Sequence, residues 1–154
     1  MKTLIVYYSL EGNTKMVAEM IANKIGADLL ELKPVKNYPK GRVSKYLWGG
    51  KSAVMGDSPE LEKYDTDLSL YDMIILGTPV WASTLTPPLR TFIKQNTLTD
   101  KTVAAFACTA SESAGKTFDE LEALLKKPLA KKERFTDPLK GREKKLEEKI
   151  ATFL

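Results

Sequence analysis

The chain has 154 residues, 43% of them hydrophobic and 29% charged, with a formal net charge of +4. This length and composition predict one globular domain over residues 1–154, and we expect neither a membrane span nor a signal peptide. The absence of histidine excludes a Ser-His-Asp triad and a Cys-His dyad and argues against a zinc site. Cys108 is the single cysteine, which excludes an intrachain disulfide and fits a reducing cytoplasm.

The amino-terminal segment predicts a strand, a polar loop and a helix in direct succession. A buried strand is expected at residues 3–8, the loop covers residues 9–14, and Asn13 is suited to the N-cap of the helix. Gly26 stands where a left-handed residue commonly ends a helix. Apolar side chains recur at helical spacing between these ends: Val17, Met20, Ile21 and Ile25.

The loop at residues 9–14 has the composition of a phosphate-binding turn. Backbone N–H groups and the positive end of the helix dipole converge in front of such a helix. Ser9 and Thr14 each offer a hydroxyl donor, and Gly12 lets the backbone approach an anion closely. The glycine spacings of nucleoside-triphosphate and dinucleotide loops are absent, which favours a phosphate monoester. The alternative is an ordinary capped turn between a strand and a helix.

The rest of the chain alternates between strand and helix patterns. Further strands are expected at residues 28–33, 73–77, 102–107 and 132–136, the first with the weaker apolar pattern of an edge strand. Further helices are expected after Thr86-Pro87-Pro88, at residues 114–126 and at residues 141–153. The long connection at residues 34–71 is expected to hold a short helix near residues 44–55. This alternation predicts an α/β fold with a parallel, doubly wound sheet, although periodicity does not order its strands.

The run Ser9-Leu10-Glu11-Gly12-Asn13-Thr14 resembles the [ST]-x-[ST]-G-x-[ST] loop with which flavodoxins hold the phosphate of FMN. Glu11 replaces the middle hydroxyl, so we expect its carboxylate to point outward and the backbone amides to contribute more. The resemblance extends over almost the whole chain, including the turn at residues 135–140. It implies a flavodoxin-like three-layer sandwich with a five-stranded parallel sheet. The strand order is then 2-1-3-4-5, for which flavodoxin is the standard example.

Two further loops follow central strands and are expected at the same edge of the sheet. The segment Thr78-Pro79-Val80-Trp81-Ala82-Ser83-Thr84 offers a Trp face suited to a flavin ring. Short flavodoxin relatives usually have a glycine in this loop, whereas this chain has none there. The small residues at 108–113 let backbone amides reach the ring, and Cys108 is expected to be an inert buried thiol. Tyr46 or Trp48 is a candidate for the other ring face.

The resemblance thus implies one set of cofactor-binding residues, and we assign no catalytic residue and no metal ligand. The set comprises Ser9, Leu10, Glu11, Gly12, Asn13, Thr14, Thr78, Pro79, Val80, Trp81, Ala82, Cys108, Thr109, Ala110 and Ser113.

Two other site classes can be excluded from the same residues. Residues 110–117 come close to a nucleotide-binding P-loop, but Ala110 replaces its first glycine and no strand ends in a magnesium-binding aspartate. A response-regulator receiver needs acidic residues after the first strand and an aspartate ending the third. Tyr8-Ser9 and Thr78 stand there instead.

Three functions remain open. We favour a low-potential electron carrier that uses FMN, with redox proteins or a small acceptor as partners. The alternatives are an NAD(P)H-dependent quinone or small-acceptor oxidoreductase and a cofactor-free interaction domain. A pI near 9.0 is unusual for a carrier, since carriers tend to be acidic around the flavin, whereas the lack of a second domain argues against a nicotinamide enzyme. We expect a cytoplasmic monomer or weak homodimer that binds neither nucleic acid nor membrane.

The positive charge is concentrated near the carboxyl terminus. Residues 126–149 contain ten Lys or Arg and five Asp or Glu. Such a segment is usually a solvated helix face with pairs of opposite charge, and the alternative is a docking surface for an acidic partner.

Overall fold

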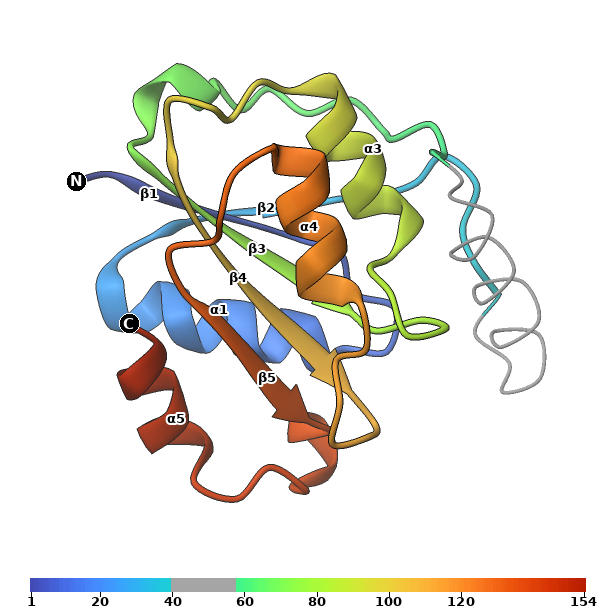
Figure 1. Cartoon of the computed structure of the whole chain (residues 1–154), viewed down its shortest axis with the longest axis vertical. Helices are drawn as coiled ribbons and strands as arrows, with labels where there is room; N and C mark the ends of the chain where they lie inside the picture. Colours follow the sequence, from blue (N-terminus) through green and yellow to red (C-terminus); the bar gives the residue numbers. More distant parts are fainter. Residues whose placement is uncertain (40–57) are drawn as a thin grey trace.

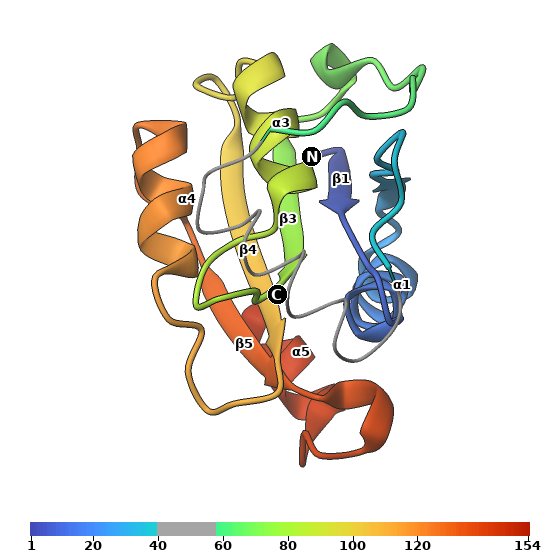
Figure 2. The same cartoon turned by 90° about the vertical axis from the view of Figure 1, so that its right-hand side faces the viewer.

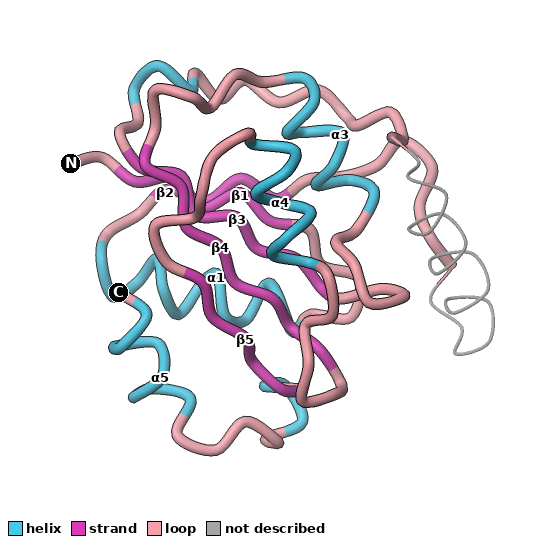
Figure 3. Tube along the Cα trace, in the orientation of Figure 1, coloured by secondary structure: helices cyan, strands magenta, loops and turns pink. Residues whose placement is uncertain are grey.

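The computed structural model describes residues 1–39 and 58–154. Five strands form one sheet in the order β2-β1-β3-β4-β5, and every neighbouring pair is parallel (Figures 1 and 3). The expected α/β fold and strand order are therefore confirmed. The strands are β1 (Thr3–Tyr7), β2 (Asp28–Glu31), β3 (Met73–Pro79), β4 (Thr102–Thr109) and β5 (Lys132–Thr136).

Helices cover both faces of the sheet, which gives three layers (Figure 2). Helices α1 (Asn13–Ile25) and α5 (Leu146–Phe153) lie on one face, and α3 (Pro87–Gln95) and α4 (Thr117–Leu125) lie on the other. Two short 3-10 helices, η1 (Leu68–Leu70) and η2 (Pro138–Lys140), lie in the connections. None of the helices in the described ranges combines the length and the apolar character needed to cross a bilayer.

Alternation along the central strands divides the core into two clusters. In β1, Leu4 and Val6 pack beneath α3 and α4, whereas Ile5 and Tyr7 pack against α1 and α5. All five residues of β1 are buried, as expected of a central parallel strand covered on both sides. The sheet therefore exposes its ends and loops, and binding chemistry is confined to them.

Helix α1 begins differently from the sequence expectation. Gly12, with φ at +106°, is the N-cap and Asn13 is the first helical residue, so the prediction of Asn13 as N-cap is wrong. The left-handed glycine makes the turn, and the Oδ1 atom of Asn13 accepts a hydrogen bond from the Leu139 N–H at 2.9 Å. Gly26 ends the helix in the left-handed conformation, as predicted. Ile25, the last helical residue, is 41% exposed, so its assignment to the buried apolar side of this helix is wrong.

Other element boundaries differ by a few residues. Helix α4 begins three residues later than expected, because Gly115 takes a φ of +57° just before it. Helix α5 begins five residues later, since Gly141 and Lys145 have positive φ. Strands β3 and β4 each extend two residues further, β1 and β2 end one and two residues earlier, and β5 has the expected bounds.

The two ends of the long connection at residues 34–71 run side by side. The Val35 N–H donates to the Glu60 carbonyl at 2.9 Å, and the Glu62 N–H donates to the Lys33 carbonyl at 2.7 Å. Pro34 and Leu61 form an antiparallel bridge between them. The helix expected near residues 44–55, with Tyr46 and Trp48, lies outside the described residues.

Gly77 in β3 makes room for an aromatic side chain of the core. A Cβ atom on Gly77 would lie 2.4 Å from Cζ of Phe106, its neighbour in β4. Phe106 in turn packs edge-on against Phe135 and Phe153, with ring centroids 6.1 and 6.5 Å apart. The aromatic cluster between β4, β5 and α5 therefore requires a residue without a side chain at position 77.

We predict that Gly77→Ala lowers the free energy of unfolding by about 1–3 kcal/mol, the usual cost of overpacking a core. Urea denaturation monitored by circular dichroism measures this loss. The double variant Gly77→Ala/Phe106→Leu should lose less free energy of unfolding than the two single variants together, because leucine at position 106 no longer clashes with the new Cβ atom. A Gly77→Ala variant as stable as the wild type would contradict this account.

Candidate functional site

The loops that follow β1, β3 and β4 surround one cavity of about 270 Å³ at the carboxyl edge of the sheet. Parallel pairing brings the three strand ends together, since Tyr7 is in register with Gly77 and Pro79 with Cys108. The cavity is lined by Ser9, Leu10, Glu11, Asn13, Thr14, Pro79, Val80, Trp81, Ala82, Ser83, Cys108, Thr109, Ala110, Ser111, Ser113, Gly115 and Asp137. Its location agrees with the rule that ligands of such sheets bind outside the carboxyl ends of the strands.

The structure brings together all of the predicted site residues except two. Thr78 is buried beneath the site, where its hydroxyl accepts a hydrogen bond from the Thr86 N–H at 3.1 Å. Gly12 shapes the first loop without lining the cavity. The sequence interpretation missed four lining residues: Ser83, Ser111, Gly115 and Asp137. The first three lie within or beside predicted loops, whereas Asp137 comes from the turn after β5, which carried no phosphate-binding signal.

In the first loop, backbone N–H groups converge on the Ser9 side chain. The N–H groups of Gly12 and Lys15 both donate to Oγ of Ser9, each at 3.2 Å. The hydroxyl oxygen therefore lies where the amides at the start of α1 point, as in an anion-binding helix terminus. Gly12 enables this turn by its left-handed conformation.

Thr14 carries a buried hydroxyl that has no oxygen or nitrogen partner in the described part of the protein and lies beside the Cys108 thiol. The residue is 1% exposed and lines the cavity, and its Oγ1 atom has no hydrogen-bond partner within the described part of the chain. An unpaired buried hydroxyl costs free energy unless a ligand completes it. Together with the Ser9 hydroxyl, which the two amides hold in place, it forms a pair of hydroxyl donors that fits a phosphate group.

The second loop forms a tight hairpin without a glycine. Trp81 and Thr84 exchange two backbone hydrogen bonds, of 3.0 and 3.1 Å, and the two residues between them have positive φ, +50° at Ala82 and +63° at Ser83. This is the pattern of a type I′ turn, which usually selects Asn or Gly. The Ser83 carbonyl accepts a hydrogen bond from the N–H of Lys116, the N-cap of α4, at 2.7 Å, so the start of α4 holds the strained hairpin in place.

Trp81 belongs to an aromatic cluster that the sequence did not reveal. Its ring meets Tyr8 at 5.6 Å and Tyr38 at 5.0 Å between centroids, in edge-to-face geometry. Trp81 is 8% exposed, so only a small part of the indole reaches the cavity surface. Burial raises the pKa of the Tyr8 hydroxyl well above its usual range, with a smaller contribution from Tyr38. This cluster supplies a rigid, mainly apolar wall.

The third loop is organised by its own hydroxyl groups. The Thr109 side chain accepts the Ser111 N–H at 3.1 Å, and the Ser113 side chain accepts the Gly115 N–H at 3.0 Å. Cys108 precedes it as a buried thiol, and burial raises the pKa of Cys108 to about 12, with Asp137 adding to the rise and Thr14 opposing it. A thiol with such a pKa remains protonated at neutral pH and is a poor nucleophile, as the sequence interpretation expected.

The cavity thus has two chemically different ends. Hydroxyl and amide donors from the first loop lie at one end, and the hairpin, the aromatic wall and the third loop lie at the other. This arrangement suits an anionic group joined to a flat, largely apolar ring. Glu11 lines the cavity and is exposed, and the outward direction of its carboxylate stays a prediction. Asp137 is a second acidic lining residue.

Comparisons with known proteins agree with this geometry. A family model described as flavodoxin matches residues 2–146. A presumed flavoprotein from Bacteroides uniformis shares 30% identity, with 86% of this chain and 88% of that chain covered and a TM-score of 0.74. A flavoprotein from Lactobacillus acidophilus, crystallised in complex with FMN, shares 26% identity over 86% and 92% of the two chains, with a TM-score of 0.75. The comparison with curated proteins gave no match.

We predict that Thr14→Val raises the free energy of unfolding of the protein without ligand by about 1 kcal/mol, because it removes a buried hydroxyl without a partner. Urea denaturation measures the gain. Thr117→Val is a matched control: Thr117 is also buried with an unpaired hydroxyl but does not line the cavity, so it should give a similar gain. A loss of stability in Thr14→Val alone would show that its hydroxyl is satisfied within the protein.

Proposed function

The chain belongs to the flavodoxin family, and from this premise we propose that it binds FMN and acts as a low-potential electron-transfer carrier. The observation that carries the FMN assignment is the donor set at the start of α1. Ser9 and Thr14 both line the cavity: the Thr14 hydroxyl is unpaired, and the Ser9 hydroxyl accepts the N–H groups of Gly12 and Lys15 while its own hydrogen is available to a ligand. The FMN complex of the Lactobacillus acidophilus protein, at 26% identity, supports this assignment.

The residues divide between the two parts of the cofactor. Ser9, Asn13, Thr14 and the adjacent amides would hold the phosphate, with Leu10 and Glu11 completing the loop. The ring would lie among residues 79–82 and 108–113, and when bound it supplies the redox chemistry. The protein residues would position the cofactor, and the hydrogen bonds of the hairpin would hold the ring-side loop in one conformation.

We favour the carrier role over an NAD(P)H-dependent oxidoreductase, and in the described ranges one α/β domain forms the cavity at the carboxyl edge of the sheet. An NAD(P)H-dependent enzyme remains a second candidate. Electron carriers are usually acidic and bind basic partner proteins, whereas this chain is basic, with a pI near 9.0. A cofactor-free interaction domain is the third. We place the protein in a reducing compartment, the cytoplasm, because its single cysteine is a buried free thiol.

We predict that the purified protein binds FMN and shows flavin absorption bands. Ser9→Ala/Thr14→Ala should weaken FMN binding about a hundredfold, because two hydrogen bonds to a charged group are lost. Riboflavin, which lacks the phosphate, should bind both proteins equally. Fluorescence titration measures both affinities, and Thr117→Val is the control that should bind FMN like the wild type. Unchanged FMN affinity in the double variant would refute the phosphate assignment.

We predict that the FMN-loaded protein does not turn over NADPH with a quinone acceptor when it is alone. Electron transfer to the acceptor should begin once a flavin-dependent reductase is added, because a carrier receives its electrons from a protein partner. Loss of NADPH absorbance in a stopped-flow mixture measures the rate. Steady oxidation of NADPH without the reductase would favour the oxidoreductase instead.

A further inference from the structure

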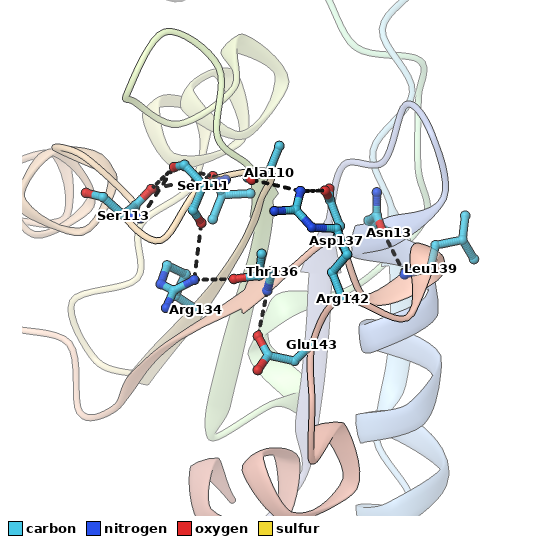
Figure 4. Close-up of polar contacts among 11 residues, drawn as sticks. Asn13, Ala110, Ser111, Ser113, Arg134, Thr136, Asp137, Leu139, Arg142 and Glu143 are labelled. Carbon is cyan, nitrogen blue, oxygen red and sulfur yellow. Dashed lines mark hydrogen bonds and ion pairs between the residues drawn. The ribbon is translucent and has the colours of Figure 1, made fainter.

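The turn after β5 packs against the phosphate-binding loop. The Leu139 N–H donates to Oδ1 of Asn13 at 2.9 Å, and a Cβ on Gly12 would lie 3.4 Å from the Leu139 side chain. The Asp137 N–H donates to the Thr109 carbonyl at 2.9 Å. Residues 137–142 therefore contact both the phosphate loop and the third loop, as Figure 4 shows.

This contact brings a carboxylate into the cavity that is proposed to hold a phosphate. Asp137 is 7% exposed and lines the cavity together with Thr14 and Cys108. Glu11 is a second acidic lining residue, and the lining residues in the described ranges include no Lys or Arg. A buried carboxylate beside a phosphate dianion is strongly unfavourable unless a positive charge compensates it.

Arg142 supplies that positive charge: it does not line the cavity itself, but it contacts two residues that do, Asp137 and Ala110. Its Nη1 atom lies 2.6 Å from Oδ2 of Asp137 and donates to the Ala110 carbonyl at 3.1 Å (Figure 4). The Asp137 side chain is 9% exposed, whereas the Arg142 side chain is 55% exposed. The guanidinium thus joins the buried carboxylate to the third loop while its outer part remains in water.

The turn keeps other anchors when this ion pair is removed. The Thr136 N–H donates to Oε2 of Glu143 at 2.6 Å, and Lys149 pairs with the same carboxylate at 3.2 Å. Arg134 donates to the Ser111 carbonyl at 3.2 Å, which holds the third loop from a second side. None of these contacts involves Arg142, so we expect the segment to stay folded when the charge of Arg142 is removed.

We propose that Arg142 is the charge-compensating residue of the phosphate site, paired with Asp137 so that the cavity accepts the doubly negative phosphate of FMN. The inference rests on the proposed function. It also gives part of the basic segment at residues 126–149 a role inside the molecule, where the sequence suggested a solvated face or a docking surface. Arg142 acts through Asp137 and is a positioning residue for charge, not a catalytic one.

The test compares FMN with riboflavin in Arg142→Gln, Asp137→Asn and the double variant, by fluorescence titration at low salt. Arg142→Gln should weaken FMN binding about tenfold and leave riboflavin binding unchanged, because only the phosphate meets the uncompensated carboxylate. Asp137→Asn should bind FMN at least as tightly as the wild type, since asparagine tolerates the left-handed backbone there. The double variant should regain the wild-type FMN affinity.

Lys144→Gln is the matched control, because Lys144 is exposed in the same segment and loses the same charge. It should change FMN affinity less than twofold. Arg142→Gln with wild-type FMN affinity, or with equal losses of FMN and riboflavin, would overturn the inference while leaving the proposed function intact. A wild-type protein that binds riboflavin and FMN equally would overturn the phosphate site itself, and a wild type that binds neither would overturn the proposed function.

Discussion

Parallel pairing of β1, β3 and β4 is the constraint on which the site depends. Because neighbouring strands run in the same direction and in close register, their carboxyl ends reach one edge together. Loops that are separated by about seventy and thirty residues in the chain thereby surround one cavity. The core on both faces of the sheet fixes this edge, since helices cover the rest of each central strand. The chemistry of the site is then a property of loop residues held by a rigid support.

Within that cavity, an anion would be recognised mainly by dipoles. The hydroxyls of Ser9 and Thr14 provide donors at the start of α1, while the guanidinium of Arg142 is paired with the carboxylate of Asp137. The lining residues in the described ranges include two acidic residues and no Lys or Arg, so under the proposal the pairing of Asp137 with Arg142 balances the charge of the site. The turn after β5 thus connects the end of the chain to the first loop through electrostatics as well as packing.

The ring-side wall shows how tertiary contacts stabilise a locally unfavourable backbone. Ala82 and Ser83 both take positive φ, a conformation that costs non-glycine residues about 1 kcal/mol or more. Paired hydrogen bonds between Trp81 and Thr84 and the contact with Lys116 offset this cost. Without a glycine, the local sequence does not favour a tight turn with positive φ at this place, but the surrounding contacts stabilise it. A long-range contact also decides the role of Asn13. Its side chain does not cap α1 but accepts a hydrogen bond from the N–H of Leu139, 126 residues away.

The sequence alone determined the alternation of strands and helices, the three loops that border the site and the resemblance that supplied the strand order. These are local signals, carried by apolar periodicity, glycine and hydroxyl residues near one another in the chain. Only the tertiary structure decided that Asp137 enters the cavity, that Thr78 is withdrawn from it, and that Trp81 is largely covered by Tyr8 and Tyr38. Those outcomes depend on which distant side chains compete for the same space and hydrogen bonds, and no local pattern records that competition.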